Sequence, residues 1–244
     1  MASGAPRAGL WSRAITARHL VIDPVDVLLD LAAAERSLWS WWAHQLGLPV
    51  EHVAATARNL PLREAVTDLR AQATAERATT VADEILQVQG RRSQLHRLVR
   101  RRRGAASLLR SIPASHVALW TTLDEDELAA LEGRARLPLP PRRLCGLAVT
   151  DDERARDFLT DGGRAVTDWL AFESHPSGVE RAERLGYPSV LVLPESTGGR
   201  ARPGAASTTP HEDALVAEDP ALLSVTPSSD GLTVGVRRQA RLLP

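Results

Sequence analysis

An apolar run at residues 20–22 leads directly into Asp23, and this junction constrains the fold more than any other segment of the chain. An aspartate at the end of a buried strand loses much of its water, so it usually has a chemical role. Residues 31–46 follow, with apolar side chains at three- and four-residue spacing, and they end before Gly47, which is typical of a helix and its C-cap. The order of strand, aspartate and helix predicts an α/β protein with a site at the end of its first strand.

Apolar runs and turn residues predict five strands and a large block of helices. The expected strands lie at residues 18–22, 116–120, 144–149, 168–172 and 189–193. The expected helices lie at residues 31–46, 50–58, 62–71, 74–88, 95–109, 125–133, 152–159 and 178–185, with a break at Gly90. Residues before 18 are expected to be irregular, residues 196–210 a flexible loop, and Asp230-Gly231 the turn of a final hairpin.

Five of these helices fall between the first two strands, and the later elements alternate. This order predicts a doubly wound parallel sheet with an all-helical insertion after the first strand. Residues 1–30 and 106–244 would form the α/β core, and residues 31–105 the helical insertion. Trp39, Trp41 and Trp42 lie in the insertion, where we expect them to pack in its interior.

The charge composition favours a small-molecule or protein ligand over a nucleic acid or a membrane. Basic and acidic residues balance at 30 each, all the basic residues are arginine, and there is no lysine. No apolar stretch is long enough to span a membrane. With Cys145 as the only cysteine, an intramolecular disulfide is excluded and a reducing, cytoplasmic location is expected.

The segment Asp23-Pro24-Val25-Asp26-Val27-Leu28-Leu29-Asp30 resembles the first motif of the haloacid dehalogenase-like (HAD) superfamily. That motif reads Asp-x-Asp-Gly-(Thr/Val)-Leu-x-Asp. In this register Asp23 falls on the family's nucleophile, Val25 on its second aspartate and Asp26 on its glycine. The segment Trp169-Leu170-Ala171-Phe172-Glu173-Ser174-His175-Pro176-Ser177-Gly178-Val179-Glu180-Arg181-Ala182 resembles the fourth motif, Val-Phe-Glu-Asp-Ser-x-x-Gly-Val-x-Ala-Ala. The helical insertion is similar to the cap of the β-phosphoglucomutase-like subgroup.

The resemblance implies phosphoryl transfer through an aspartyl phosphate. Asp23 would attack phosphorus, Thr121 and its neighbour Thr122 would hold phosphoryl oxygens, and Mg²⁺ would lie between Asp23 and Glu173. Three parts of this machinery depart from the family. Val25 replaces the general acid, Ser174 replaces a metal carboxylate, and the family's lysine has no counterpart.

These departures predict a weakened Mg²⁺ site and a weak or inactive phosphoryl-transfer site, so that the chain would act as a pseudoenzyme binding a small ligand or a protein partner. The alternative is an active phosphatase or phosphomutase-like hydrolase that acts through Asp23 on a small phosphorylated metabolite such as a sugar phosphate. In that case Asp26 would be the acid, if the loop is displaced by one residue. The missing lysine would be replaced electrostatically by one of three arginines, namely Arg154, Arg156 or Arg164.

Two features have simpler structural interpretations. Thr121 and Thr122 could cap the next helix or bond to strand-end amides. The arginines between Arg91 and Arg103 could bind phosphate or nucleic acid, but no aromatic residues are interleaved with them. We therefore expect a solvated helix end there.

Overall fold

The computed structural model describes residues 11–73, 78–192, 215–217, 220–229 and 231–237. Its centre is a six-stranded sheet in the order β6-β5-β2-β7-β8-β9, and every neighbouring pair is parallel. The strands are β2 (His19–Ile22), β5 (Val117–Thr121), β6 (Arg143–Cys145), β7 (Trp169–Glu173), β8 (Ser189–Val192) and β9 (Leu215–Ala217). The predicted α/β fold with a doubly wound parallel sheet is confirmed.

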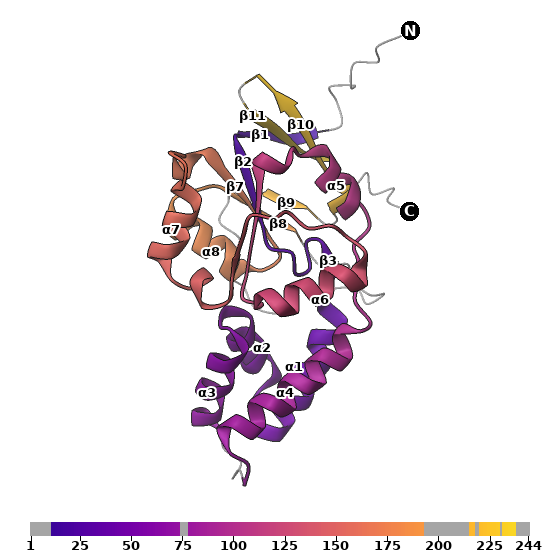
Figure 1. Cartoon of the computed structure of the whole chain (residues 1–244), viewed down its shortest axis with the longest axis vertical. Helices are drawn as coiled ribbons and strands as arrows, with labels where there is room; N and C mark the ends of the chain where they lie inside the picture. The colour runs from indigo at the N-terminus through magenta and orange to yellow at the C-terminus, as the bar shows by residue number, and fades with distance from the viewer. Residues whose placement is uncertain (1–10, 74–77, 193–214, 218–219, 230, 238–244) are drawn as a thin grey trace.

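Helices cover both faces of this sheet because its central strands are apolar on both sides. The helices are α5 (Ala105–Ser111), α6 (Glu125–Ala135), α7 (Asp152–Thr160) and α8 (Pro176–Leu185). Leu20 and Ile22 of β2 pack in one core cluster with residues of α5 and α6, whereas Val21 packs with residues of α7 and α8. This alternation follows from the two-residue period of a strand and gives the layered arrangement in Figure 1.

Four helices form a group with its own apolar core. They are α1 (Ala32–Leu46), α2 (Val50–Asn59), α3 (Leu62–Gln72) and α4 (Val81–His96), and they lie together at one end of the molecule (Figure 1). Trp39 and Trp42 are fully buried in this core and Trp41 is partly buried against it, as expected for packing residues. The group is connected to the sheet through two short antiparallel strands, β3 (Leu29–Asp30) and β4 (Arg100–Arg101).

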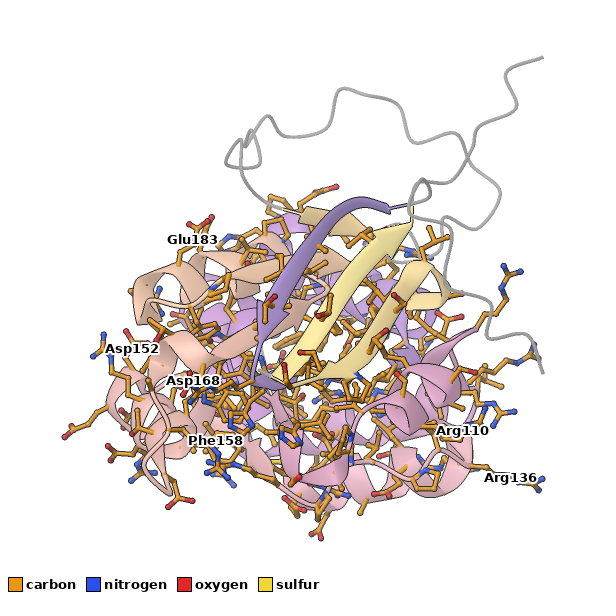
Figure 2. All side chains as sticks on the ribbon, turned by 90° about the horizontal axis from the view of Figure 1, so that it is seen from above. Arg110, Arg136, Asp152, Phe158, Asp168 and Glu183 are labelled. Atoms are coloured by element: carbon orange, nitrogen blue, oxygen red, sulfur yellow. The ribbon has the colours of Figure 1, made fainter. Side chains whose placement is uncertain are left out.

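The opposite end of the molecule carries a small antiparallel sheet in the order β1-β11-β10. Its strands are β1 (Trp11–Ala17), β10 (Leu223–Ser228) and β11 (Gly231–Arg237). Figure 2 views this sheet from above, with Asp152 and Glu183 at one side of the molecule and Arg110 and Arg136 at the other. The hairpin of β10 and β11 was predicted, although Asp230 itself lies outside the described residues.

Several sequence predictions about individual elements are wrong. Strand β1 was not predicted, because it forms by pairing with β11 from the far end of the chain. The strand expected at residues 144–149 ends at Cys145, and Gly146 with its φ of 64° begins a 3₁₀ turn. Gly90 does not break α4, which runs through it. The expected loop at residues 196–210 lies outside the described residues.

The helix expected at residues 95–109 is also wrong. The chain leaves α4 after His96, forms β4 and enters α5 only at Ala105. Extended backbone is needed here because β4 pairs with β3 and the Arg102 amide donates to the Leu28 carbonyl at 2.8 Å. This pairing overrides the local helical pattern of the arginine-rich segment. Arg102 is therefore buried, not part of a solvated helix end.

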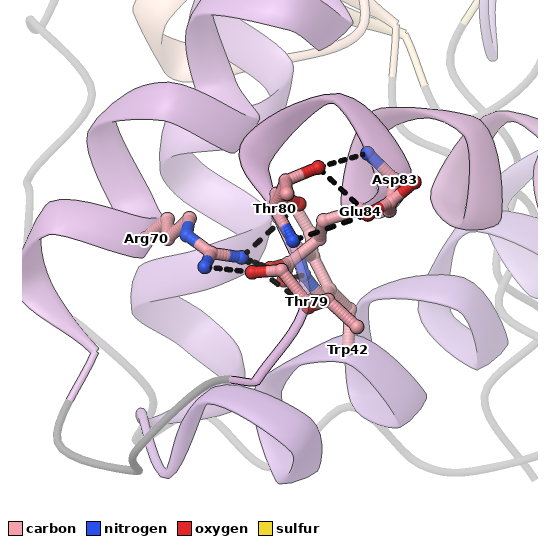
Figure 3. A network of polar contacts seen from close by, with 6 residues as sticks. All are labelled: Trp42, Arg70, Thr79, Thr80, Asp83 and Glu84. Carbon is pink, nitrogen blue, oxygen red and sulfur yellow. Dashed lines mark hydrogen bonds and ion pairs between the residues drawn. The ribbon is translucent and has the colours of Figure 1, made fainter.

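A buried carboxylate, Glu84 of α4, holds three helices of the group together (Figure 3). Glu84 is 1% exposed and accepts a hydrogen bond from the Trp42 indole at 2.8 Å. The Arg70 guanidinium lies 2.6 Å from its other oxygen and also donates to Thr79 and to the Thr80 carbonyl. Thr80 and Asp83 form a reciprocal capping box at the start of α4.

Within the described residues, each helix is too short or too polar to cross a membrane.

Removing Arg70 should destabilise the fold strongly, because it leaves the Glu84 carboxylate buried without its ion pair. We expect Arg70→Met to lower the free energy of unfolding by about 3–5 kcal/mol, measured by urea denaturation. Arg63→Met, at an exposed position of the same helix, is the matched control and should change it by less than about 0.5 kcal/mol. A double substitution of Arg70 and Glu84 by methionine should recover much of the loss. An Arg70→Met protein as stable as the control would contradict this account.

Candidate functional site

A small cavity of about 40 Å³ lies at the carboxyl ends of β2, β5 and β7, facing the helical group. Asp23 directly follows β2, Thr121 ends β5 and Glu173 ends β7, and all three residues line this cavity. Parallel strands bring their carboxyl ends to the same edge of a sheet, which is where ligands of open α/β sheets bind. The structure therefore brings together the three residues that the sequence singled out.

The Asp23 carboxylate is held by backbone and side-chain donors. Its Oδ1 accepts a hydrogen bond from the Val25 amide at 3.0 Å, and the Ser174 hydroxyl donates to Oδ2 at 3.4 Å. The Asp23 amide donates to the Phe172 carbonyl at 3.0 Å, which continues the β2–β7 pairing by one residue. Desolvation raises the pKa of Asp23 well above its usual value, and the negative charge of Glu173 raises it further.

The Glu173 carboxylate is more completely enclosed. Its side chain is 1% exposed, and its Oε1 accepts a hydrogen bond from the Trp120 indole at 2.8 Å. Burial raises the pKa of Glu173 to about 7, opposed by the charge of Arg181 and by the Trp120 hydrogen bond. Gly178 leaves the space for this carboxylate, since a Cβ at that position would lie 2.0 Å from Glu173 Oε2.

Asp26, which the sequence offered as a substitute acid, is occupied in holding the loop. Its φ of 56° is left-handed, a conformation that suits the glycine of the resembling motif. Its Oδ1 accepts a hydrogen bond from the Leu31 amide at 3.0 Å, at the start of α1. The Arg102 side chain donates to the Asp26 carbonyl. Asp26 lines the cavity, but its carboxylate is directed to the backbone that begins the first helix of the group.

The remaining predicted site residues also line the cavity. Thr121 is buried, and its hydroxyl oxygen accepts a hydrogen bond from the Leu123 amide at 3.3 Å. Thr122 lies beside it on the cavity wall. Val25 lines the cavity two residues after Asp23, where the resembling motif has its acid. At this position the cavity has an isopropyl group and no proton donor.

Four further charged residues line the cavity. Three of them were not selected from the sequence, and the fourth, Arg92, was expected in a solvated helix end but is buried. Glu35 of α1, Arg58 of α2 and Arg92 of α4 come from the helical group, and Arg181 comes from α8. A signal for two of them was present in the sequence. Glu35 lies four residues after Leu31 and Arg92 four residues after Val88, on apolar helical stripes where a charged side chain must be buried.

Glu35 is the most strongly perturbed group on the helical side of the cavity. It is 6% exposed, and burial together with the charge of Asp26 raises its pKa to about 7. The charges of Arg92 and Arg58 partly oppose this shift. Arg92 also lies 3.3 Å from Glu127 of α6 and so connects the helical group to the sheet layer. The Nε atoms of Arg58 and Arg92 are buried and have no hydrogen-bond partner among the described residues.

The three arginines proposed from the sequence to replace the lysine do not line this cavity. Arg154 is 68% exposed and lies 3.5 Å from Asp151, and Arg164 donates to the Asp161 carbonyl. The cation beside Asp23 and Glu173 is Arg181 instead, because its helix packs next to β7 and β8 and directs it inward. That placement depends on α8 packing, which the spacing of arginines in the sequence does not reveal.

The carboxylates that line the cavity are not gathered into a metal-binding group. Within the described part of the chain, no group of three or more His, Cys, Asp or Glu side chains is arranged to hold a metal ion. Asp23 and Glu173 are neighbours, but Ser174 offers only a hydroxyl and the Glu173 carboxylate already binds the Trp120 indole. Burial lowers the pKa of His175 to about 4, so its imidazole is neutral at pH 7.

Sequence comparison finds no matching family model and no matching curated protein. Solved structures do match. A β-phosphoglucomutase candidate from Thermotoga maritima is 19% identical, with 84% of this chain and 95% of that chain covered and a TM-score of 0.55. CbbY from Rhodobacter sphaeroides in complex with phosphate is 17% identical, with 84% and 96% covered and a TM-score of 0.62. A haloacid dehalogenase-like protein of unknown function from Agrobacterium tumefaciens is 13% identical, with 72% and 82% covered and a TM-score of 0.55.

These matches cover 72–84% of this chain, so the structure has the fold of HAD-like proteins, including those similar to β-phosphoglucomutase. The resemblance first seen in the two motifs is therefore confirmed at the level of the fold. The roles of Asp23, Asp26, Thr121, Thr122 and Glu173 remain predictions, because sequences this distant share a fold without necessarily sharing a site.

Filling the space beside Glu173 should damage the site. We expect Gly178→Ala to displace the Glu173 carboxylate and to lower the free energy of unfolding by about 1–3 kcal/mol, because the core there is overpacked. Gly133→Ala in α6 is the matched control, since a Cβ there meets no atom within 4 Å. The control should be neutral or stabilising by up to about 1 kcal/mol. Equal stability of the two variants in urea denaturation would show that Glu173 is not confined as described.

Glu35 should make stability depend on pH. The pKa of Glu35 is raised from 4.5 to about 7, so the fold favours its protonated form. The contribution of Glu35 to the free energy of unfolding is therefore fully present below pH 4.5 and is lost as the pH rises through about 7. Glu35→Gln should therefore be more stable than the unmodified protein at pH 8, by at most about 3 kcal/mol, and the difference should vanish near pH 4.5. The exposed Glu51→Gln is the control for urea denaturation across this range. A difference that does not change with pH would contradict the assignment.

Proposed function

We propose that this chain binds a small phosphorylated metabolite in the Asp23 cavity and transfers its phosphoryl group weakly or not at all. The observation that carries the proposal is that Asp23 keeps the position of the nucleophile while the position of the general acid has no proton donor. Asp23 lies beside Thr121, Thr122 and Arg181 in an enclosed cavity, whereas Val25 occupies the acid's place. The HAD-like fold, together with the complex that CbbY forms with phosphate, supports a phosphoryl ligand.

The missing acid limits the chemistry. A general acid that protonates the leaving oxygen typically contributes a factor of about 10²–10⁴ to the rate. Asp26 does not supply this proton in our proposal, because its carboxylate accepts hydrogen bonds at the start of α1. The raised pKa of Asp23 further reduces its nucleophilicity, since only the ionised carboxylate attacks phosphorus. Substrates whose leaving groups need no protonation, such as aryl phosphates, would be the ones that react.

The carboxylate set does not fit a tightly held Mg²⁺. Such a site needs oxygen ligands at a near-octahedral centre, commonly one or two carboxylates free to coordinate. Here Ser174 stands in place of one carboxylate, and Glu173 is bound by Trp120 and enclosed by Gly178. We therefore propose a weakened Mg²⁺ site and derive no catalytic step from the ion.

The helical group would act as a cap over the ligand. Glu35, Arg58 and Arg92 reach the cavity from α1, α2 and α4, opposite the sheet edge that carries Asp23. We propose that the cap extends over about residues 31–105, with the β3–β4 pair at its base. The two guanidinium groups have buried Nε donors without partners among the described residues, so they favour a ligand with an anionic or oxygen-rich end beyond its phosphoryl group.

A second candidate function is an active phosphatase that uses Glu35 as its acid. The observation in its favour is the pKa of about 7 of a carboxyl group that lines the same cavity. A pKa near the working pH is the optimum for general acid catalysis. In this alternative, Glu35→Gln abolishes turnover of alkyl phosphates. In our main proposal such turnover is negligible in the unmodified protein.

Substitutions at the two motif positions test the proposal. We expect slow turnover of an aryl phosphate that is lost in Asp23→Asn, and negligible turnover of sugar phosphates. Val25→Asp combined with Ser174→Asp should raise sugar phosphate turnover, by at most about 10²–10⁴ from the restored acid. Val25→Asn with Ser174→Asn is the matched control, similar in shape but without the added carboxyl groups. An unmodified protein that hydrolyses a sugar phosphate at an ordinary enzymatic rate through Asp23 would overturn the proposal.

A further inference from the structure

Arg181 is held in a fixed position at the wall of the Asp23 cavity. It lies on α8, three residues after Gly178, and its guanidinium carbon is 4.9 Å from the centroid of the Trp120 ring. One of its terminal nitrogens donates to the Val149 carbonyl at 3.3 Å. Trp120 in turn donates to Glu173. The guanidinium therefore packs on the same tryptophan that bonds to the Glu173 carboxylate.

The charge of Arg181 acts on both carboxylates of the site. It lowers the pKa of Glu173 and that of Asp23, against the larger effect of desolvation. The Nε of Arg181 is buried and has no hydrogen-bond partner among the described residues. A guanidinium has five N–H donors in a rigid fork that matches phosphate oxygens, so this side chain has donors to offer a ligand.

The carboxylates of Asp23 and Glu173 are a poor set of ligands for a divalent cation, because Trp120 and Ser174 already bond to them. A fixed guanidinium beside the same pair of carboxylates opposes a divalent cation further, because like charges repel strongly in a poorly solvated cavity. Positive charge is nevertheless needed wherever a phosphoryl group lies next to two carboxylates. Arg181 provides such a charge from within the chain.

We propose that the Arg181 guanidinium supplies the positive charge that holds a phosphoryl group at Asp23, so that this protein binds phosphate without a divalent cation. The inference rests on the proposed function and specifies how its ligand is held. It also assigns a role to a position of the fourth motif at which the family has an alanine. Lysine at this position would keep the charge but lose the fork, so Arg181→Lys should retain part of the binding.

Binding of inorganic phosphate, measured by isothermal titration calorimetry with EDTA and again with Mg²⁺, tests the proposal. The unmodified protein should bind equally well in both conditions, within about twofold. Arg181→Gln should bind about tenfold more weakly in EDTA, the loss expected for one charge-assisted contact. Arg184→Gln is the matched control, because Arg184 lies on the same helix, is 56% exposed and pairs with Asp152. The control should bind like the unmodified protein.

Two results would overturn the proposal: a gain of about tenfold or more on adding Mg²⁺ to the unmodified protein, or unchanged binding by a folded Arg181→Gln. If Arg181→Gln does not fold, Arg181→Lys and the comparison of EDTA with Mg²⁺ decide the question. Failure to bind phosphate in either condition would overturn the proposed function, and this inference with it. Binding that requires Mg²⁺ would overturn the inference alone.

A titration with Mn²⁺ alone, followed by the electron paramagnetic resonance signal of the free ion, provides a readout that needs no phosphate. We expect no saturable binding by the unmodified protein, because the positive charge of Arg181 opposes a cation at the carboxylate pair. Arg181→Gln should bind Mn²⁺ more tightly than either the unmodified protein or Arg184→Gln. Equal, saturable binding of Mn²⁺ by all three proteins would contradict the proposal.

Discussion

Two carboxylates lie side by side at one edge of the parallel sheet, that of Glu173 buried and that of Asp23 partly buried, and the surrounding contacts offset the cost of placing them there. The Val25 amide and the Ser174 hydroxyl bond to Asp23, and the Trp120 indole bonds to Glu173. Arg181 adds the opposing charge. Unpaired buried charges are expensive, so these contacts are conditions for folding as well as for any chemistry.

The same constraint explains why the cavity is closed by a separate helical group. Glu35, Arg58 and Arg92 would be costly in the apolar interior of the helical group, but at its base the two arginines oppose the charge of Glu35. The Arg92–Glu127 contact and the β3–β4 pair connect the two parts. The group keeps its own apolar core around Trp39 and Trp42, so the polar residues are left at its base.

Much of the fold could be predicted from sequence because its determinants are local. Apolar strands that end in Asp23, Thr121 and Glu173 placed these residues at one sheet edge, and the structure confirms the sheet. What could not be predicted depends on distant contacts. Strand β1 needs β11, residues 100–101 become a strand by pairing with β3, and Arg181 reaches the cavity because α8 packs beside β7 and β8. Local patterns carry no information on such pairings.

The central claim is that the Asp23 cavity is a phosphoryl site held by residues of the chain itself. A crystal structure with tungstate, a phosphate mimic located by its anomalous scattering, tests this claim most directly when metal ions are removed by EDTA. We predict one ordered anion in contact with the Asp23 loop, the Thr121 hydroxyl and the Arg181 guanidinium. An empty Asp23 cavity, with tungstate bound only to exposed arginines such as Arg100 and Arg101, would contradict it.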